Sequence, residues 1–263
     1  MDLGLKGRKA LVLGASKGIG LGIASALAAE GVDLLLAARS AEAVEANAQK
    51  LASEHGVGVK AKAVDLADPA SVAALIGWAR DEGEVAILVN NGGGPPPSGA
   101  LGVPPERWTS HFQSMVASLI AVTDAMVPAM RSNGFGRVLT VASSGVVQPI
   151  PTLAVSNTLR ASIVAYMKTL AGEVAADGVT VNVLLPGRIN TDRLRNLDKA
   201  RAEKSGESIE DIAKASQAEI PAARYGTVEE FGAVAAFLSG VPAAYVTGSI
   251  IRIDGGLIRA VGG

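Results

Sequence analysis

The sequence has no cysteine and only two histidines, His55 and His111, among its 263 residues. The lack of cysteine excludes disulfides, thiolate metal ligands and a cysteine nucleophile, and it is typical of proteins from a reducing compartment. Two histidines offer almost no material for a histidine-based metal cluster or a serine–histidine–aspartate triad. We therefore predict no metal site.

Aromatic residues are also scarce, at 3%, whereas hydrophobic residues make up 49% of the chain. The core must then consist of Ala, Val, Leu and Ile, which suits helices packed on a parallel sheet. The formal net charge is -1, and no run of like charges indicates binding to nucleic acid or to a membrane surface. No uninterrupted apolar stretch reaches the roughly 18 residues of a membrane span. We expect a soluble, cytoplasmic protein.

Short apolar runs alternate with longer amphipathic segments along the whole chain, which indicates repeated strand–helix–strand units. Strands are predicted near 9–14, 33–38, 58–64, 85–90, 136–142, 179–185 and 249–253. Helices are predicted near 19–30, 41–54, 69–81, 105–131, 154–176 and 227–239. The expected fold is α/β: one Rossmann-like, doubly wound domain over 1–263, with a mostly parallel seven-stranded sheet covered by helices on both faces.

Two segments interrupt this alternation. Residues 90–99 contain four glycines and three prolines and must form a loop. Residues 188–220 are rich in Arg, Lys, Glu and Ser and follow a strand end, where lids commonly lie. We predict a polar insertion there that covers a binding site.

The first predicted strand leads through Gly14, Gly18 and Gly20 directly into an apolar helix. Glycines at such a turn let the backbone approach a pyrophosphate, whose charge is met by the helix N-terminus. The second predicted strand ends at Arg39, about twenty residues after the last glycine, where an acidic residue would bind the ribose hydroxyls of NAD. Arg39 and Lys17 instead offer two cations to a 2′-phosphate, so NADP(H) is favoured over NAD(H).

The spacing G-x-x-x-G-x-G resembles the glycine motif of the short-chain dehydrogenase/reductase family, although Leu13 stands where that family usually has Thr. Further motifs follow in the family's order over essentially the whole chain: Asp65-Leu66, Asn90-Asn91-Gly92-Gly93, Pro186 to Thr191, and Asp254-Gly255-Gly256. Within that family, the sequence resembles the β-ketoacyl carrier-protein reductases.

The resemblance implies which residues contact the cofactor. They are Gly14, Ser16, Lys17, Gly18, Ile19, Gly20, Arg39, Ser40, Asp65, Leu66, Asn90, Gly92, Pro186, Gly187, Ile189 and Thr191. Ile189 would contact the nicotinamide amide and Thr191 the phosphates. The resemblance also implies a homotetramer in which segments 105–131 and 154–176 form one interface.

The family's catalytic pattern is altered in this sequence. Ser143 matches the family's serine, but Ser156 stands where the proton-donating Tyr belongs and Arg160 where the Lys belongs. An aliphatic hydroxyl titrates far above a phenol, and a guanidinium does not release a proton, so the usual proton relay is missing. Met115 occupies the position of the family's Asn, which would end the water chain to the Lys.

Four replacements for the proton donor remain open. Tyr166 lies nearly three helical turns beyond Ser156, so packing on the helix is the expected role. Tyr225 is near the insertion, and His111 is one turn before Met115. Water could also protonate an alkoxide if Ser143, Ser156 and Arg160 polarise the carbonyl.

Three functions fit this pattern. The first is a divergent NADP(H)-dependent oxidoreductase acting on a small carbonyl, acyl or alcohol substrate, similar to 3-oxoacyl carrier-protein reductases. The second is a sensor or partner subunit that binds NADP(H) without turnover. The third is a lyase or isomerase that uses Arg160 to bind an anion. The retained glycine turn supports the first two equally.

Overall fold

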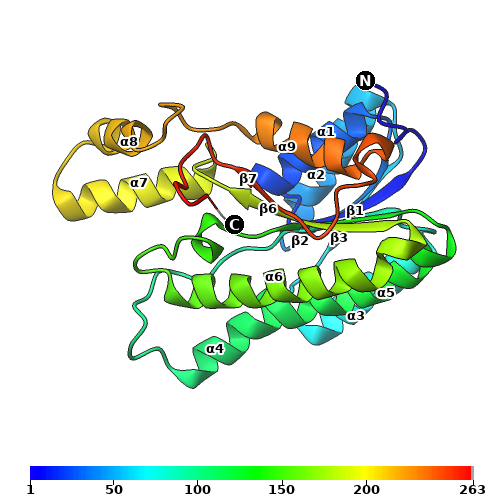
Figure 1. Cartoon of the computed structure of the whole chain (residues 1–263), viewed down its shortest axis with the longest axis horizontal. Helices are drawn as coiled ribbons and strands as arrows, with labels where there is room; N and C mark the ends of the chain where they lie inside the picture. Colours follow the sequence, from blue (N-terminus) through cyan, green and yellow to red (C-terminus); the bar gives the residue numbers. More distant parts are fainter. Residues whose placement is uncertain (262–263) are drawn as a thin grey trace.

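The computed structural model of the chain describes residues 1–261 and contains one seven-stranded sheet, with all strands parallel (Figure 1). The strand order is β3-β2-β1-β4-β5-β6-β7. The strands are β1 (Lys9–Leu13), β2 (Asp33–Ala38), β3 (Val59–Ala63), β4 (Ile87–Asn90), β5 (Gly136–Val141), β6 (Val179–Pro186) and β7 (Ile250–Ile253). The predicted fold class is confirmed, and each predicted strand is present within two residues of its expected ends.

Nine α-helices accompany the strands in the described residues. They are α1 (Gly18–Ala29), α2 (Ala41–His55), α3 (Pro69–Asp81), α4 (Pro105–Phe112), α5 (Ser118–Ser132), α6 (Ala154–Val174), α7 (Asp192–Ser205), α8 (Ile209–Ala218) and α9 (Val228–Ser239). A π-helical turn, η1 (Gln113–Ala117), joins α4 to α5, and short 3-10 turns follow as η2 (Ser144–Val146), η3 (Ala175–Asp177) and η4 (Val241–Ala243).

Local sequence signals explain where several helices begin and end. Ser40 caps the start of α2 by accepting a hydrogen bond from the backbone of Ala43, and the helix ends at Gly56 in the left-handed conformation. The start of α9 is a complete capping box, in which Thr227 and Glu230 each accept a hydrogen bond from the other's backbone N–H. These caps hold the helix ends in place without help from the sheet.

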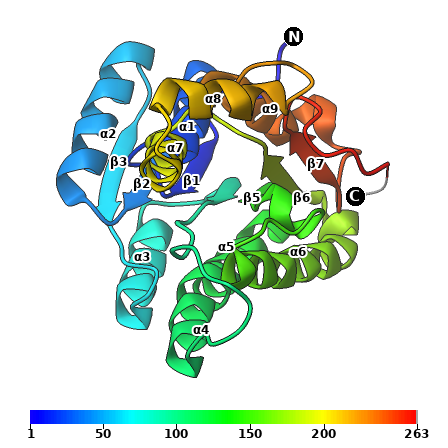
Figure 2. The same ribbon diagram turned by 90° about the vertical axis from the view of Figure 1, so that its left-hand side faces the viewer.

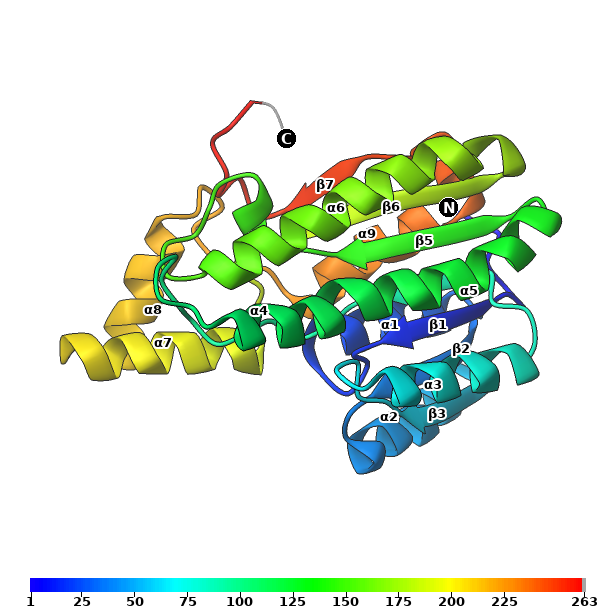
Figure 3. The same ribbon diagram turned by 90° about the horizontal axis from the view of Figure 1, so that it is seen from below.

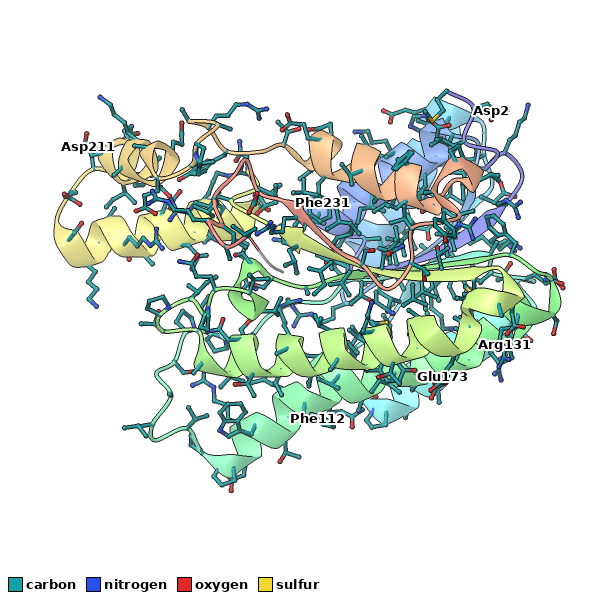
Figure 4. All side chains as sticks on the ribbon, in the orientation of Figure 1. Asp2, Phe112, Arg131, Glu173, Asp211 and Phe231 are labelled. Atoms are coloured by element: carbon teal, nitrogen blue, oxygen red, sulfur yellow. The ribbon has the colours of Figure 1, made fainter. Side chains whose placement is uncertain are left out.

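Helices cover both faces of the sheet (Figure 2), and each face has its own hydrophobic cluster. Helices α3, α5 and α6 cover one face, and α1, α2 and α9 cover the other. Phe231 of α9, labelled in Figure 4, is fully buried in the second cluster. Because both faces are buried, strands such as β4 are apolar on both sides, as the sequence predicts for a covered parallel sheet.

The predicted helix over 105–131 is helical throughout but contains the π turn η1. Gln113 donates a hydrogen bond to the Ser118 hydroxyl, which in turn donates to the Leu66 carbonyl at 2.7 Å. This polar chain ties the turn to the loop after β3, and it accounts for an irregularity that hydrophobic periodicity does not reveal.

By length and composition, the joined helix Pro105–Ser132 is the one segment of the described chain able to cross a membrane. No such segment is expected from the sequence, which has no uninterrupted apolar stretch of the required length. One face of this helix packs in the same hydrophobic core as α3 and α6. A buried core helix can have the length and apolar composition of a membrane span. The packing against the sheet is the structural role that we observe (Figure 3).

Helices α1 and α9 approach each other through two glycines. A Cβ atom at Gly232 would lie 2.4 Å from the Gly22 carbonyl oxygen, which no side chain could tolerate without a backbone shift. Gly232→Val should therefore lower the free energy of unfolding by about 3 kcal/mol, measured by urea denaturation. Gly172→Ala, on the exposed side of α6 with nothing near its Cβ position, is the matched control and should not destabilise. Equal stability of both variants would contradict the close packing.

Helices α7 and α8 form most of the predicted insertion 188–220 and project beyond the carboxyl ends of the strands (Figures 1 and 3). The Tyr225 hydroxyl donates a 2.8 Å hydrogen bond to the buried Asp198 of α7. The Arg188 guanidinium donates to the Ser216 carbonyl at the end of α8 and pairs with Glu219. These contacts fix the insertion above the strand ends.

Candidate active site

The strand order reverses direction between β1 and β4, and the carboxyl ends of strands at such a switch point are where ligands commonly bind in α/β folds. The segments that leave β1, β4, β5 and β6 all meet at this edge. They are the four segments in which the sequence analysis places the glycine turn, the loop 90–99, Ser143 and the Pro186–Thr191 motif. The structure thus brings most of the predicted site residues to one edge.

The glycine turn is a bare backbone cradle. Gly14 and Gly18 have φ angles of 65° and 60°, which favour glycine. A Cβ atom at Gly20 would lie 2.3 Å from the Gly14 carbonyl oxygen, so the turn closes tightly on the first helical residues. Lys17, which precedes α1, makes no side-chain cap, so the first amide N–H groups of α1 face outward without a side-chain partner.

Two asparagines support this turn from outside the motif. The Asn91 amide donates to the carbonyls of Leu13 and Gly14, at 3.3 and 3.4 Å. The Asn47 amide, on α2, donates to the carbonyls of Ala15 and Ser16, at 3.1 and 2.9 Å. Asn47 was not predicted, because it belongs to no sequence motif and only the folded helix brings it to the turn.

The two predicted phosphate-binding cations have different surroundings. Lys17 forms a 3.3 Å ion pair with Asp192 at the start of α7, and Asp192 also accepts a hydrogen bond from Arg195. Both contacts, that of Arg195 first, hold the pKa of Asp192 below its usual value. Arg39 lies exposed at the end of β2. The glycine turn and the insertion are therefore joined by one exposed ion pair.

The other residues predicted to contact the adenosine part of the cofactor differ in exposure and in their contacts. Ser40 is exposed and caps α2, and Asp65 is exposed and accepts a hydrogen bond from the Ala67 backbone. Leu66 lies beside Gly92, 3.6 Å from its Cβ position. The Asn90 amide is fully buried and donates to Thr123 of α5, so only the Asn90 backbone remains for a contact at the carboxyl ends of the strands. These cofactor contacts stay predictions.

The segment after β6 is fixed by backbone pairing. Gly187 donates to the Ile253 carbonyl, and a Cβ atom there would lie 2.5 Å from the Asp254 Cα atom. The Ile189 side chain is buried against Gly226, which leaves its backbone for the predicted nicotinamide contact. Thr191 caps α7, and its methyl group lies 3.4 Å from the Cβ position of Gly18. Thr191 is thus next to the glycine turn, as the phosphate prediction requires.

Ser143 follows β5, and the Arg160 guanidinium reaches the backbone at the end of the same strand. The Ser143 hydroxyl accepts a 3.1 Å hydrogen bond from the Gly145 N–H. Ser156 is buried, and Arg160 follows one helical turn later on the same face of α6. The Arg160 guanidinium donates to the Val141 carbonyl at 2.9 Å and to the Gly92 carbonyl at 3.2 Å. Arg160 therefore connects the ends of β4 and β5 through their backbones.

Burial, and then the nearby Arg193, lower the pKa of Arg160 to about 10. The guanidinium nevertheless keeps its charge at neutral pH. Arg160 is thus a permanent cation at the ends of β4 and β5.

Backbone hydrogen bonds connect the loop 90–99 to the segment before α6. The Ser98 N–H donates to the Thr152 carbonyl at 2.7 Å, and the Ala154 N–H donates to the Ser98 carbonyl. Thr152 has a φ of 64°, a strained angle for a residue with a Cβ atom. Arg107 of α4 donates to the Pro96 carbonyl at 2.9 Å. The loop is therefore held rigidly over the end of β5.

The two tyrosines considered as alternative proton donors hydrogen-bond to other residues. The Tyr166 hydroxyl donates to Asp124 at 2.6 Å between α6 and α5, and burial with this bond raises its pKa. Tyr225 donates to Asp198, and burial raises its pKa as well. Met115 lies in the core, and His111 is half-buried one turn away, with no ring hydrogen bond to Ser143, Ser156 or Arg160 within residues 1–261.

Comparisons with known proteins agree over nearly the whole chain. Residues 14–258 match a family model described as enoyl-(acyl carrier protein) reductase. The 3-oxoacyl-(acyl-carrier-protein) reductase FabG of Escherichia coli strain K12 is 34% identical over 258 residues, which cover 97% of this chain and 99% of that protein. The D-beta-hydroxybutyrate dehydrogenase of Cupriavidus necator is 33% identical over 256 residues, covering 97% and 99%.

The solved structures include one that superposes almost completely. The L-sorbose reductase of Gluconobacter frateurii, complexed with NADPH and L-sorbose, has a TM-score of 0.95 and 32% sequence identity. The match covers 99% of this chain and 100% of that one. The fold and nearly the whole length are thus shared with proteins named as reductases and dehydrogenases.

Proposed function

The chain belongs to the short-chain dehydrogenase/reductase family, and on that premise we propose that it is an NADPH-dependent oxidoreductase that interconverts a carbonyl compound and an alcohol. The observation that carries the proposal is the bare glycine cradle after β1, at the switch point of the sheet. NADPH, when bound, supplies the hydride. The residues of the chain bind the reactants, orient them and polarise the carbonyl.

The residues at the switch point of the sheet fit a dinucleotide. Side chains at Gly14 or Gly20 would collide with Asn91 or with the turn itself, so the open backbone there is a built feature. The uncapped first turn of α1 offers N–H donors and the positive end of the helix dipole to a diphosphate. Thr191 lies against Gly18 through its methyl group, and its hydroxyl caps the start of α7 nearby.

Two cations support NADPH over NADH. Arg39 at the end of β2 and Lys17 in the glycine turn are both exposed and able to reach a 2′-phosphate, and the end of β2 has no carboxylate to bind a free ribose. The L-sorbose reductase that superposes on this chain was crystallised with NADPH.

Arg39→Asp should reverse this preference. The new carboxylate would repel a 2′-phosphate and accept hydrogen bonds from ribose hydroxyls, so the ratio of the NADH Kd to the NADPH Kd should fall by about tenfold or more. Fluorescence titration of both dinucleotides measures the ratio. Arg201→Gln, an exposed arginine of α7 far along that helix, is the control and should leave the ratio unchanged. An unaltered ratio in Arg39→Asp would mean that Arg39 does not meet the ribose.

The proposed chemistry relies on electrostatics more than on proton donation. Ser143 and Ser156 donate hydrogen bonds to the carbonyl oxygen, and the charge of Arg160 stabilises the negative charge that develops on it. The proton reaches the oxygen from water, since neither serine nor Arg160 is a suitable acid near neutral pH. We therefore expect slow turnover, because a positioned general acid contributes about 10²–10⁴-fold.

The same departures from the family's catalytic pattern also favour a second function. A protein that binds NADPH as a sensor or partner subunit needs the cradle but neither Tyr nor Lys, and it would tolerate Met115 in the core. Fluorescence titration with NADPH and NADH, followed by turnover assays on a panel of ketones and aldehydes, separates the two. Oxidation of NADPH by any panel member supports the reductase, whereas tight binding without oxidation supports the sensor.

The homotetramer implied by the family is also a proposal. It would place helices α5 and α6 at one subunit interface, where Ala and Val permit close helix packing. Sedimentation of the purified protein measures the assembly directly.

A further inference from the structure

Three arginines contact the loop 90–99, which itself contains no ionisable residue. Arg107 donates to the Pro96 carbonyl, and Arg160 donates to the Gly92 carbonyl. Arg193 of α7 lies against Gly94, where a Cβ atom would be only 2.9 Å from its Nη2 atom. Gly94 thus makes room for the Arg193 guanidinium directly above the loop.

Arg193 differs from the other two in its contacts. No hydrogen bond or ion pair of its guanidinium occurs within residues 1–261. Its neighbour Asp192 is engaged by Lys17 and Arg195, and Glu219 is engaged by Arg188. Among the described residues, Asp192 and Glu219 are therefore committed to other cations.

Arg193 and Arg160 both contact the same short stretch of the loop, at Gly94 and Gly92 respectively. They are close enough for the charge of Arg193 to lower the pKa of Arg160, although burial is the larger cause. Two like charges held next to each other repel, so a bound anion between them would be strongly stabilised. Planar guanidinium groups suit a planar carboxylate in particular.

We propose that Arg193, together with Arg160, binds the carboxylate of the carbonyl substrate, and that the substrate is therefore a short oxo acid. The inference rests on the proposed function and narrows its substrate class. Ser156 precedes Arg160 by one turn on the same face of α6, so the anion and the carbonyl lie close together. A carboxylate one or two carbons from the carbonyl fits this spacing better than a long acyl chain.

The test uses oxamate and oxamide, which have nearly the same shape but differ in one negative charge. Calorimetric titration of the NADPH-loaded protein should give an oxamate Kd at least about tenfold lower than the oxamide Kd. Arg193→Gln should remove that preference and leave the NADPH Kd unchanged. Arg201→Gln, which removes an exposed arginine elsewhere on α7, should keep the preference.

Other results would overturn the proposal. If Arg193→Gln weakens NADPH binding and leaves the ratio of the oxamate and oxamide Kd values as it was, Arg193 serves the cofactor phosphates instead. The carboxylate site would be rejected, and the proposed function would not, if the wild-type protein bound oxamate and oxamide equally. Binding of inorganic phosphate without binding of oxamate would have the same meaning. Failure of the wild-type protein to bind NADPH rejects the proposed function and the oxo-acid substrate with it.

Discussion

The double substitution Ser156→Tyr with Arg160→Lys should raise kcat/KM for carbonyl reduction by about 10²-fold. The phenol would occupy the helix position that faces the end of β5, one turn before a lysine that favours its ionised form. A proton donor would then stand where the wild-type chain has only an aliphatic hydroxyl. Steady-state oxidation of NADPH, with the best ketone or aldehyde of the panel, measures the change.

Two controls separate proton donation from a change of shape. Ser156→Phe with Arg160→Lys introduces nearly the same volume without the hydroxyl and should not gain activity. The wild-type rate should also vary little between about pH 6 and 9, since no serine or arginine of the site titrates there and burial lowers the pKa of Arg160 only to about 10. No gain from the tyrosine variant, with NADPH binding intact, would mean that the pocket around Ser156 has been rebuilt as well.

The strands and most helices were predictable because hydrophobic periodicity and capping residues act over short distances. The run Ile87–Val89 is buried on both sides, and Ser40 and Thr227 stand where α2 and α9 begin. The π turn at Gln113–Ala117 was not predictable, because it depends on a hydrogen bond from Ser118 to Leu66, 52 residues earlier. Signals of that kind appear only after the chain has folded.

The candidate site likewise has features that could be predicted from the sequence and features that could not. The glycine turn and the departures at Ser156 and Arg160 follow from fixed spacings along the chain, so they could be identified from the sequence. Asn47 and Arg193 could not, since their contacts with Ser16 and Gly94 join segments that no motif links. The cofactor contact of Asn90 stays a prediction, and the sequence did not reveal that its side chain hydrogen-bonds to Thr123.

Gly20→Ala should weaken NADPH binding by at least about 100-fold. The new methyl group would lie 2.3 Å from the Gly14 carbonyl oxygen and 2.7 Å from the Asn91 amide, so the turn must open and its N–H groups must move. Loss of two hydrogen bonds to a charged diphosphate, at about 1.5–3 kcal/mol each, accounts for a change of this size. Fluorescence titration with NADPH measures the affinity, and thermal unfolding shows whether the variant is folded.

Gly22→Ala tests whether this loss reflects the turn or only crowding on α1. Its methyl group would lie 2.6 Å from the Val228 carbonyl oxygen, so the strain is comparable but is directed at α9 and away from the glycine turn. We expect Gly22→Ala to lower the free energy of unfolding by an amount similar to that for Gly20→Ala, while Gly22→Ala still binds NADPH. If Gly20→Ala were to bind NADPH as the wild type does, the turn after β1 would not be where the diphosphate lies, and both the reductase and the sensor would lose their physical basis.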